Sequence, residues 1–121
     1  MPTKQETFDT VVAHLRKQGC KAEDDHGNCM YRGKNGTKCG AGCLIPDDEY
    51  YPELEGSGMF DRSGKISACG RILQRLGNDI QLVNRLQGIH DGFTVGTWEE
   101  RLGFAAEDHG LQYTPPADTS A

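Results

Sequence analysis

Residues 29–50, CMYRGKNGTKCGAGCLIPDDEY, combine three cysteines and a Tyr-Arg pair with an acidic and aromatic end. A cysteine can serve as a metal ligand, as a nucleophile or as a small apolar residue, depending on its surroundings. Two short pairs have the ligand types of a tetrahedral zinc site: His26, Cys29, Cys39 and Cys43. Their spacings, HxxC and CxxxC, are less characteristic of zinc than two CxxC pairs. Cysteines packed as small apolar residues in a crowded hairpin are therefore the alternative interpretation.

A cysteine nucleophile is the second chemical alternative. Cys39 or Cys43 would have a lowered pKa at the start of a helix, and His90 with Asp91 could supply a base. Neighbouring residues on a helix point in different directions, however, and no oxyanion donor can be named. His90 near a helix end also suits the helix dipole without any catalytic role. We therefore assign no catalytic residue.

The N-terminal residues predict a helix from Thr3 to Gln18. Thr3 and Glu6 have the spacing of a capping box, and apolar residues recur on one face of the segment. Gly19 is well placed to end this helix.

Met30–Arg32 and Lys38–Gly40 are predicted to form the two arms of a β-hairpin. Asn35-Gly36 suits a type I′ turn, in which both central residues have positive φ. A two-residue turn at that position would place Arg32 opposite Cys39.

Apolar residues recur at helical spacing from Ile66 to Leu76 and from Ile80 to Ile89, which predicts two successive helices. Asn78 or Asp79 is expected to cap the second helix. The sequence then predicts a loop at residues 92–96.

A terminal helix is predicted after this loop. Thr97 and Glu100 have capping-box spacing, Gly110 is expected to end the helix, and Trp98 is expected to be buried. These elements together predict a small α+β domain with an N-terminal helix, a β-hairpin and a helical C-terminal half.

The chain of 121 residues is expected to form one globular domain over residues 1–113, followed by a disordered tail at 114–121. Its net charge of −5 argues against direct, non-specific binding of nucleic acid, which requires a basic face. No apolar run approaches the roughly 20 residues of a membrane-spanning helix, and the N-terminus does not begin like a signal peptide. We therefore expect a cytoplasmic protein with reduced thiols, without a cofactor and without contact with a membrane.

The motif in residues 29–56 resembles one found in small, mostly uncharacterised proteins of tailed bacteriophages and prophages. The shared pattern is approximately C-x-Y-R, a turn containing glycine, and C-x-x-G-x-L-I-P-D-x-x-Y, followed later by L-Q-x-x-H-D and a terminal helix with a tryptophan. The matching positions are Cys29, Tyr31, Arg32, Cys39, Gly42, Leu44, Ile45, Pro46, Asp47, Tyr50, Leu86, Gln87, His90, Asp91 and Trp98. The similarity covers most of residues 5–111. It implies no established reaction.

The resemblance implies a protein that acts in the host cytoplasm by binding. The expected partner is a bacterial host or defence-system protein, or a small signalling ligand, which the protein would inhibit or sequester. A small zinc-binding or thiol-dependent enzyme is the alternative, and a homo-oligomer with a pocket at its interface is a third. The candidate binding residues are Tyr31, Arg32, Cys39, Asp47, Tyr50, His90 and Asp91.

Arg32 is the basic residue best suited to contact a partner, because its guanidinium can bind a carboxylate or phosphate at two points. The alternative role for Arg32 is an internal salt bridge, for instance to Asp47 or Asp91.

Overall fold

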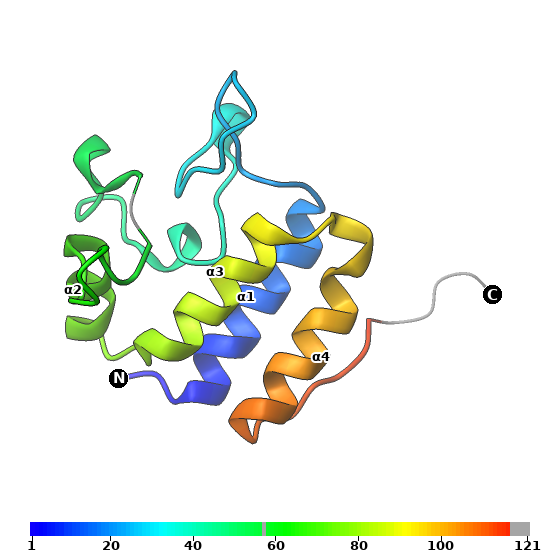
Figure 1. Ribbon diagram of the computed structural model, residues 1–121. Coiled ribbons are helices and arrows are strands. Elements are labelled where there is room, and N and C mark those ends of the chain that lie inside the picture. Colours follow the sequence, from blue (N-terminus) through cyan, green and yellow to red (C-terminus); the bar gives the residue numbers. More distant parts are fainter. Residues whose placement is uncertain (57, 117–121) are drawn as a thin grey trace.

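The computed structural model describes residues 1–56 and 58–116, and in this part of the chain it contains four α-helices joined by loops (Figure 1). The helices are α1 (Lys4–Gln18), α2 (Ala68–Arg75), α3 (Ile80–Gly92) and α4 (Trp98–His109). Four single 3-10 turns lie in the connections: η1 (Lys34–Gly36), η2 (Gly42–Leu44), η3 (Pro52–Leu54) and η4 (Val95–Thr97).

The predicted α+β class is wrong, because the described residues contain no β-strand. Residues of the expected hairpin pair at one isolated antiparallel bridge, Arg32 with Lys38. The register also differs, since Arg32 was expected opposite Cys39. A three-residue loop, η1, separates the paired backbones of Gly33 and Thr37, where Gly33 N donates to Thr37 O over 2.9 Å.

The two hairpin arms do not extend into strands because other groups satisfy their backbone. The N–H groups of Tyr31 and Arg32 donate to the carboxylate of Glu55 over 2.7 and 3.1 Å. Lys38 N donates to the side chain of Gln18 over 2.8 Å. Buried or half-buried backbone groups need partners, and here distant side chains provide them instead of a neighbouring strand.

The type I′ character of the predicted turn is nevertheless present. Asn35 has φ 61° and Gly36 has φ 74°, so both central residues adopt the positive φ that the sequence predicted.

The N-terminal helix is confirmed with its predicted caps. Glu6 N donates to the Thr3 hydroxyl over 3.0 Å, and Thr3 N donates to the Glu6 carboxylate over 2.9 Å. Gly19 ends α1 with φ 67° in the left-handed region.

The C-terminal helices are confirmed, with differences at their ends. Asp79 caps α3 by accepting a hydrogen bond from Leu82 N over 2.9 Å. The capping box predicted at Thr97 is absent: η4 runs directly into α4, and the Thr97 hydroxyl donates to Thr94 O over 2.9 Å. Gly110 ends α4 with φ 68°.

Helix α3 is the central element, since it contacts α1, α2 and α4. One apolar core fills the space between α1, α3 and α4, and Trp98 is buried in it as predicted. This core comprises Phe8, Val11, Val12, Leu15, Leu82, Leu86, Ile89, Trp98, Leu102, Ala105 and Ala106.

A second core joins the long connection between α1 and α2 to α2 and to another face of α3. It comprises Ala22, Tyr31, Cys39, Ala41, Ile45, Leu54, Met59, Cys69, Leu73, Ile80 and Val83. Residues 20–56 cover the C-terminal end of α3, and we call this segment the cap (Figure 1). This cap contains the motif that the sequence singled out.

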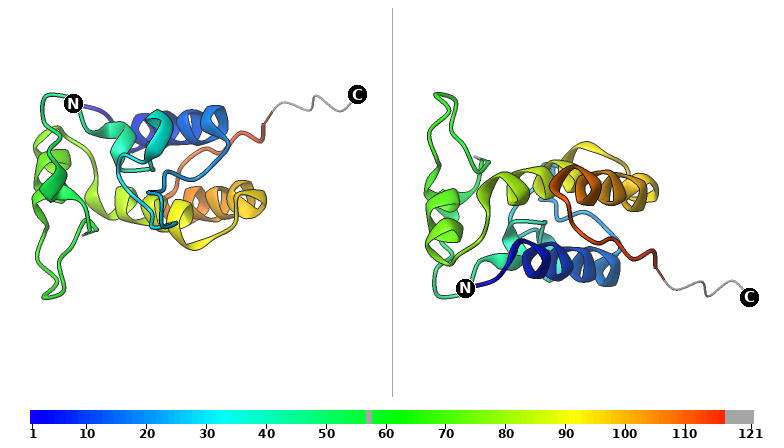
Figure 2. Two further views of the ribbon diagram at one scale, coloured as in Figure 1. Left: turned by 90° about the horizontal axis from the view of Figure 1, so that it is seen from above. Right: turned by 90° about the horizontal axis from the view of Figure 1, so that it is seen from below.

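The chain after α4 runs between α1 and α4 (Figure 2). Gln112 N donates to the Gln5 side chain over 2.8 Å, and Arg16 donates to Thr114 O over 2.7 Å. Of the tail predicted at 114–121, residues 117–121 lie outside the described residues. Among the described helices, none has both the length and the apolar composition needed to span a membrane.

Candidate functional site

The last turn of α3 carries a network of polar side chains. His90 is fully buried, and its Nδ1 lies 2.6 Å from Asp91 Oδ1. Gln87, one turn earlier on the same face, donates from Nε2 to Asp91 Oδ2 over 3.0 Å and accepts from Ala41 N over 3.0 Å. The network therefore connects α3 to the backbone of the cap.

The hydrogen bonds of His90 determine which ring nitrogen carries the proton. Ala22 N donates to His90 Nε2 over 2.9 Å, and a backbone N–H can only donate. Nε2 is therefore an acceptor without a proton, and Nδ1–H donates to Asp91. The ring is neutral, and its face stacks on Trp98 at a centroid distance of 5.5 Å.

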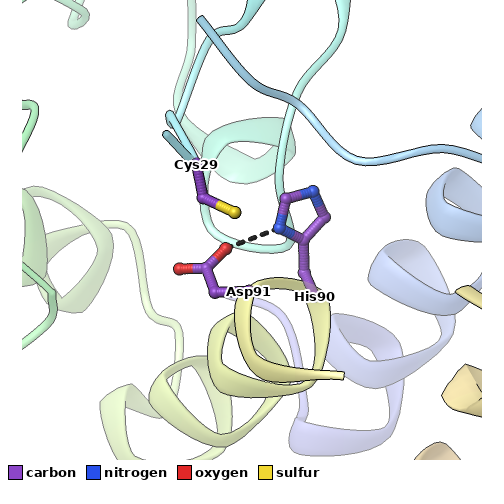
Figure 3. A group of neighbouring side chains, drawn as sticks. All are labelled: Cys29, His90 and Asp91. Atoms are coloured by element: carbon purple, nitrogen blue, oxygen red, sulfur yellow. Dashed lines mark hydrogen bonds and ion pairs between the residues drawn. The ribbon is translucent and has the colours of Figure 1, made fainter. Parts of the chain in front are cut away.

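Cys29 approaches this pair from the cap (Figure 3). Ligand atoms of Cys29, His90 and Asp91 all lie within 4.8 Å of one another. Burial, followed by the negative charge of Asp91, raises the pKa of the Cys29 thiol to about 11. At neutral pH Cys29 is therefore a protonated thiol rather than a nucleophilic thiolate.

Cys29, His90 and Asp91 are the only set of three or more metal-ligand residues that residues 1–56 and 58–116 bring together. A histidine bound to metal normally donates its other ring N–H to an acceptor. Here the nitrogen remote from Asp91 faces the donor Ala22 N–H, so a proton placed on Nε2 would oppose another proton. Metal binding through Nδ1 would therefore cost the hydrogen bond between His90 and the cap.

The zinc set considered in the sequence is not assembled. His26 is exposed, Cys39 is buried in the second core, and Cys43 packs against the first core. Burial raises the pKa of Cys43 to about 12 and raises that of Cys39 further. Neither cysteine has the lowered pKa that the nucleophile hypothesis required.

Arg32 lies in a second polar group on the cap. Its Nη1 is 2.9 Å from Asp47 Oδ1, its Nη2 donates to Ile45 O over 2.9 Å, and its guanidinium lies 4.5 Å from the centre of the Tyr50 ring. The internal salt bridge to Asp47 that the sequence offered as an alternative is thus present. These contacts use Nη1 and Nη2 of Arg32, while its buried Nε has no hydrogen-bond partner among the described residues.

Glu55 belongs to the group around Arg32. Besides the N–H groups of Tyr31 and Arg32, it accepts a hydrogen bond from the Tyr50 hydroxyl over 2.7 Å. Tyr31 itself is buried in the second core. The candidate binding residues therefore fall into two groups: Arg32, Asp47 and Tyr50 gather near Glu55, and His90 and Asp91 belong to the network in the last turn of α3.

A polar pocket of about 240 Å³ opens between the cap and α3. We call it the α3 pocket, and it is lined by Cys29, Tyr31, Glu55, Gly56, Gly58, Gln87 and Asp91. Three of the predicted or considered site residues, Cys29, Tyr31 and Asp91, thus meet in one cavity.

Sequence reasoning missed Glu55 and Gln87. Gln87 and Asp91 are four residues apart, which places them on one face of a helix, so this pair could have been found. Nothing local to Glu55 indicates that it binds the backbone more than twenty residues earlier in the chain.

The motif also contains a glycine with a purely structural role. A Cβ at Gly42 would lie 1.9 Å from the Tyr31 carbonyl oxygen, closer than two such atoms can approach. Gly42 therefore allows the chain after Cys39 to pack on Tyr31.

Comparison of the chain with protein-family models, with curated proteins and with solved structures gave no match.

Proposed function

We propose that the protein is a phage-encoded accessory protein that binds a component of the bacterial host or of a defence system and inhibits or sequesters it. The target is a protein or a small signalling molecule in the host cytoplasm. The similarity of the CxYR…CxxGxLIPDxxY motif to small phage and prophage proteins supports this setting.

The observation that carries the proposal is the state of two reactive groups: the Cys29 thiol, which lines the α3 pocket, and the buried His90 ring, which is hydrogen-bonded to Asp91 of the pocket wall. Both nitrogens of His90 are occupied by hydrogen bonds, and the thiol of Cys29 has a raised pKa. A general base needs an available lone pair near the proton that it removes, and a cysteine nucleophile needs thiolate character. His90 offers no such lone pair and Cys29 no such thiolate, whereas the fixed polar groups of the pocket suit recognition.

The zinc-binding or thiol-dependent enzyme is the second candidate function. The proximity of Cys29, His90 and Asp91 favours it, because these are zinc-ligand types. The backbone N–H of Ala22 argues against it, because metal binding at Nδ1 would place a proton on Nε2 opposite this donor. Zinc titration followed by NMR signals of the His90 ring separates the two functions: stoichiometric binding at His90 would support the enzyme.

A variant that obstructs the α3 pocket tests the binding function. Gly58 lines the pocket without a positive φ, and a Cβ there meets only Asn84 Oδ1, at an ordinary 3.8 Å. Gly58→Gln therefore adds a neutral side chain at the wall of the pocket. Gly96→Gln is the matched control, because Gly96 has no atom within 4 Å of its Cβ position and does not line the pocket.

Wild-type and variant proteins should be used to capture partners from bacterial lysate, with native mass spectrometry to detect small ligands. We expect one partner to be retained by the wild type and by Gly96→Gln and lost with Gly58→Gln. If all three proteins retain the same components, the pocket is not the binding site and the proposal fails.

A further inference from the structure

The α3 pocket carries two carboxylates that come from different parts of the chain. Glu55 follows η3 in the cap, and Asp91 lies in the last turn of α3. Each carboxylate is fixed by hydrogen bonds: Glu55 by two backbone N–H groups and the Tyr50 hydroxyl, and Asp91 by His90 and Gln87. These bonds hold both side chains in place at the pocket wall without neutralising their charge.

The Gln87 side-chain amide and the backbone N–H groups of Tyr31 and Arg32 are directed at these carboxylates. Gln87 uses its Nε2 on Asp91 and its Oε1 on Ala41 N, so its amide is committed at both atoms. A carboxylate has about four lone-pair sites, and hydrogen bonds from Tyr31 N, Arg32 N and Tyr50 occupy three on Glu55, while those from His90 and Gln87 occupy two on Asp91, as counted among the described residues. The remaining capacity of both side chains is therefore capacity to accept.

Lys21 is a cation of the cap that contacts the last turn of α3. Its Nζ donates to the backbone carbonyl of Asp91 over 3.3 Å, and its charge partly offsets the field that Asp91 creates at Cys29. Two carboxylates and one ammonium still leave the pocket negative.

Resting on the binding function proposed above, we propose that the α3 pocket binds a cationic group of a ligand, either a guanidinium or an alkylammonium. An ammonium supplies three N–H donors and a guanidinium five, with no acceptor, which complements the unused acceptor sites of Glu55 and Asp91. The volume of about 240 Å³ is smaller than the roughly 300–1,000 Å³ of typical drug-sized sites. It matches one side chain or one end of a small amine.

The ligand pair N-acetylarginine methylamide and N-acetylcitrulline methylamide tests this inference on the wild-type protein. The two compounds have nearly the same shape, but the urea of citrulline is neutral. Binding is followed at low ionic strength through the NMR signals of the Gln87 side-chain amide and the Asp91 backbone amide. We expect saturable shifts at both groups with the arginine compound and at least about tenfold weaker binding of the citrulline compound.

Agmatine and an arginine-containing peptide distinguish the two sources of such a cation. Tighter binding of agmatine indicates a free amine as the ligand, and tighter binding of the peptide indicates a side chain of a protein partner. Equal affinity of the arginine and citrulline compounds, or shifts confined to residues outside the pocket, would overturn the inference.

Three variants separate charge from bulk. Gly58→Lys brings an ammonium to the pocket wall and should weaken binding of the arginine compound about tenfold or more, whereas Gly58→Glu adds similar bulk and should weaken it much less. Gly96→Lys, with the same change of net charge away from the pocket, should bind like the wild type. Equal losses in the Lys and Glu variants would contradict a cationic ligand.

The capture experiment and the titration with the arginine compound together show whether this inference or the binding function is wrong. If Gly58→Gln abolishes capture of a partner but the arginine compound does not bind, the pocket binds a ligand of another class. If the arginine compound binds but capture is independent of Gly58, the pocket recognises cations and the proposed function is wrong.

Discussion

At the scale of single residues, the His90 side chain connects three parts of the structure. Its ring donates a hydrogen bond to Asp91 in the last turn of α3, accepts one from Ala22 N in the cap and stacks on Trp98 of the first core. These contacts require a neutral ring with its proton on Nδ1. Because both ring nitrogens are used in these hydrogen bonds, neither is available to accept a proton from Cys29.

We predict that the His90 ring is observed as the neutral Nδ1–H tautomer. Long-range proton–nitrogen NMR correlations should show an unprotonated Nε2, with the exposed His26 ring as the comparison. The reason is that Ala22 N–H can only donate to this atom. A protonated Nε2 would contradict the prediction and would make metal binding through Nδ1 compatible with the structure.

The cysteines should differ strongly in reactivity, because Cys20 is exposed and the other four thiols are buried or half-buried. Burial is the largest cause that raises the pKa of Cys29 and Cys69 to about 11, which leaves a thiolate fraction of about 10⁻³ at pH ~8. We expect iodoacetamide to label one thiol rapidly in the native protein and all five after unfolding. Cys20→Ser should remove the rapid phase, and rapid labelling of Cys29 in that variant would contradict the prediction.

At the scale of elements, the helices could be predicted from sequence because their determinants are local. Thr3, Glu6 and Gly19 act within a few residues of the ends of α1. The prediction of a β-hairpin was wrong because the partners of its backbone are distant in sequence. Glu55 and Gln18 accept hydrogen bonds from N–H groups that a second strand would otherwise bind. Turn chemistry at Asn35-Gly36 was predictable, but the extent of pairing on either side was not.

The same distinction applies to the candidate site. The sequence identified His90, Asp91 and Cys29 as chemically competent, but it placed Cys29 in a zinc set with Cys39 and Cys43. Their separation depends on how the cap folds onto α3, which brings Cys29 to the helix end and buries Cys39. Tertiary packing, which the sequence pattern does not show, therefore determines that Cys29 lies next to His90.

Arg32 should stabilise the cap mainly through contacts other than its ion pair. The Asp47 side chain is 85% exposed, and exposed ion pairs contribute only about 0–1 kcal/mol. Arg32 also binds Ile45 O and stacks on Tyr50, so Arg32→Ala should lower the free energy of unfolding by about 1–3 kcal/mol. Asp47→Ala should cost less than about 1 kcal/mol in the same denaturant titration. Equal costs would show that the ion pair dominates.

At the scale of the whole molecule, α3 connects two cores, and the chain after α4 connects the two outer helices. Tyr113 donates to Glu99 Oε1 over 2.7 Å, while Glu99 also accepts two hydrogen bonds from Arg16 of α1. Gln5 and Arg16 bind backbone groups of Gln112 and Thr114. The segment 111–116 thus links α1 to α4 largely through polar contacts at the surface.

This link should weaken in acid. The hydrogen bond from Arg16, and to a smaller extent that from Tyr113, holds the pKa of Glu99 below its ordinary value. A carboxylate with a lowered folded-state pKa contributes stability that is complete above its unfolded pKa of about 4.3 and is lost as pH falls through the folded value. Because Glu99 is half-exposed, the contribution should stay within about 1 kcal/mol.

The measurement is the NOE between the Tyr113 ring and Gly103, since a Cβ at position 103 would lie 3.6 Å from that ring. We expect the NOE to be strong at pH ~6 and to fade reversibly toward pH ~3, as protonation of Glu99 removes its charge-assisted bonds. Glu99→Gln should weaken it at pH ~6 and remove most of its dependence on pH. Glu107→Gln, a neutralisation at an exposed position of the same helix, should behave like the wild type. An NOE that persists unchanged at pH ~3 would mean that apolar packing of Tyr113 and Leu111 on the first core, rather than the Arg16–Glu99–Tyr113 group, holds the segment in place.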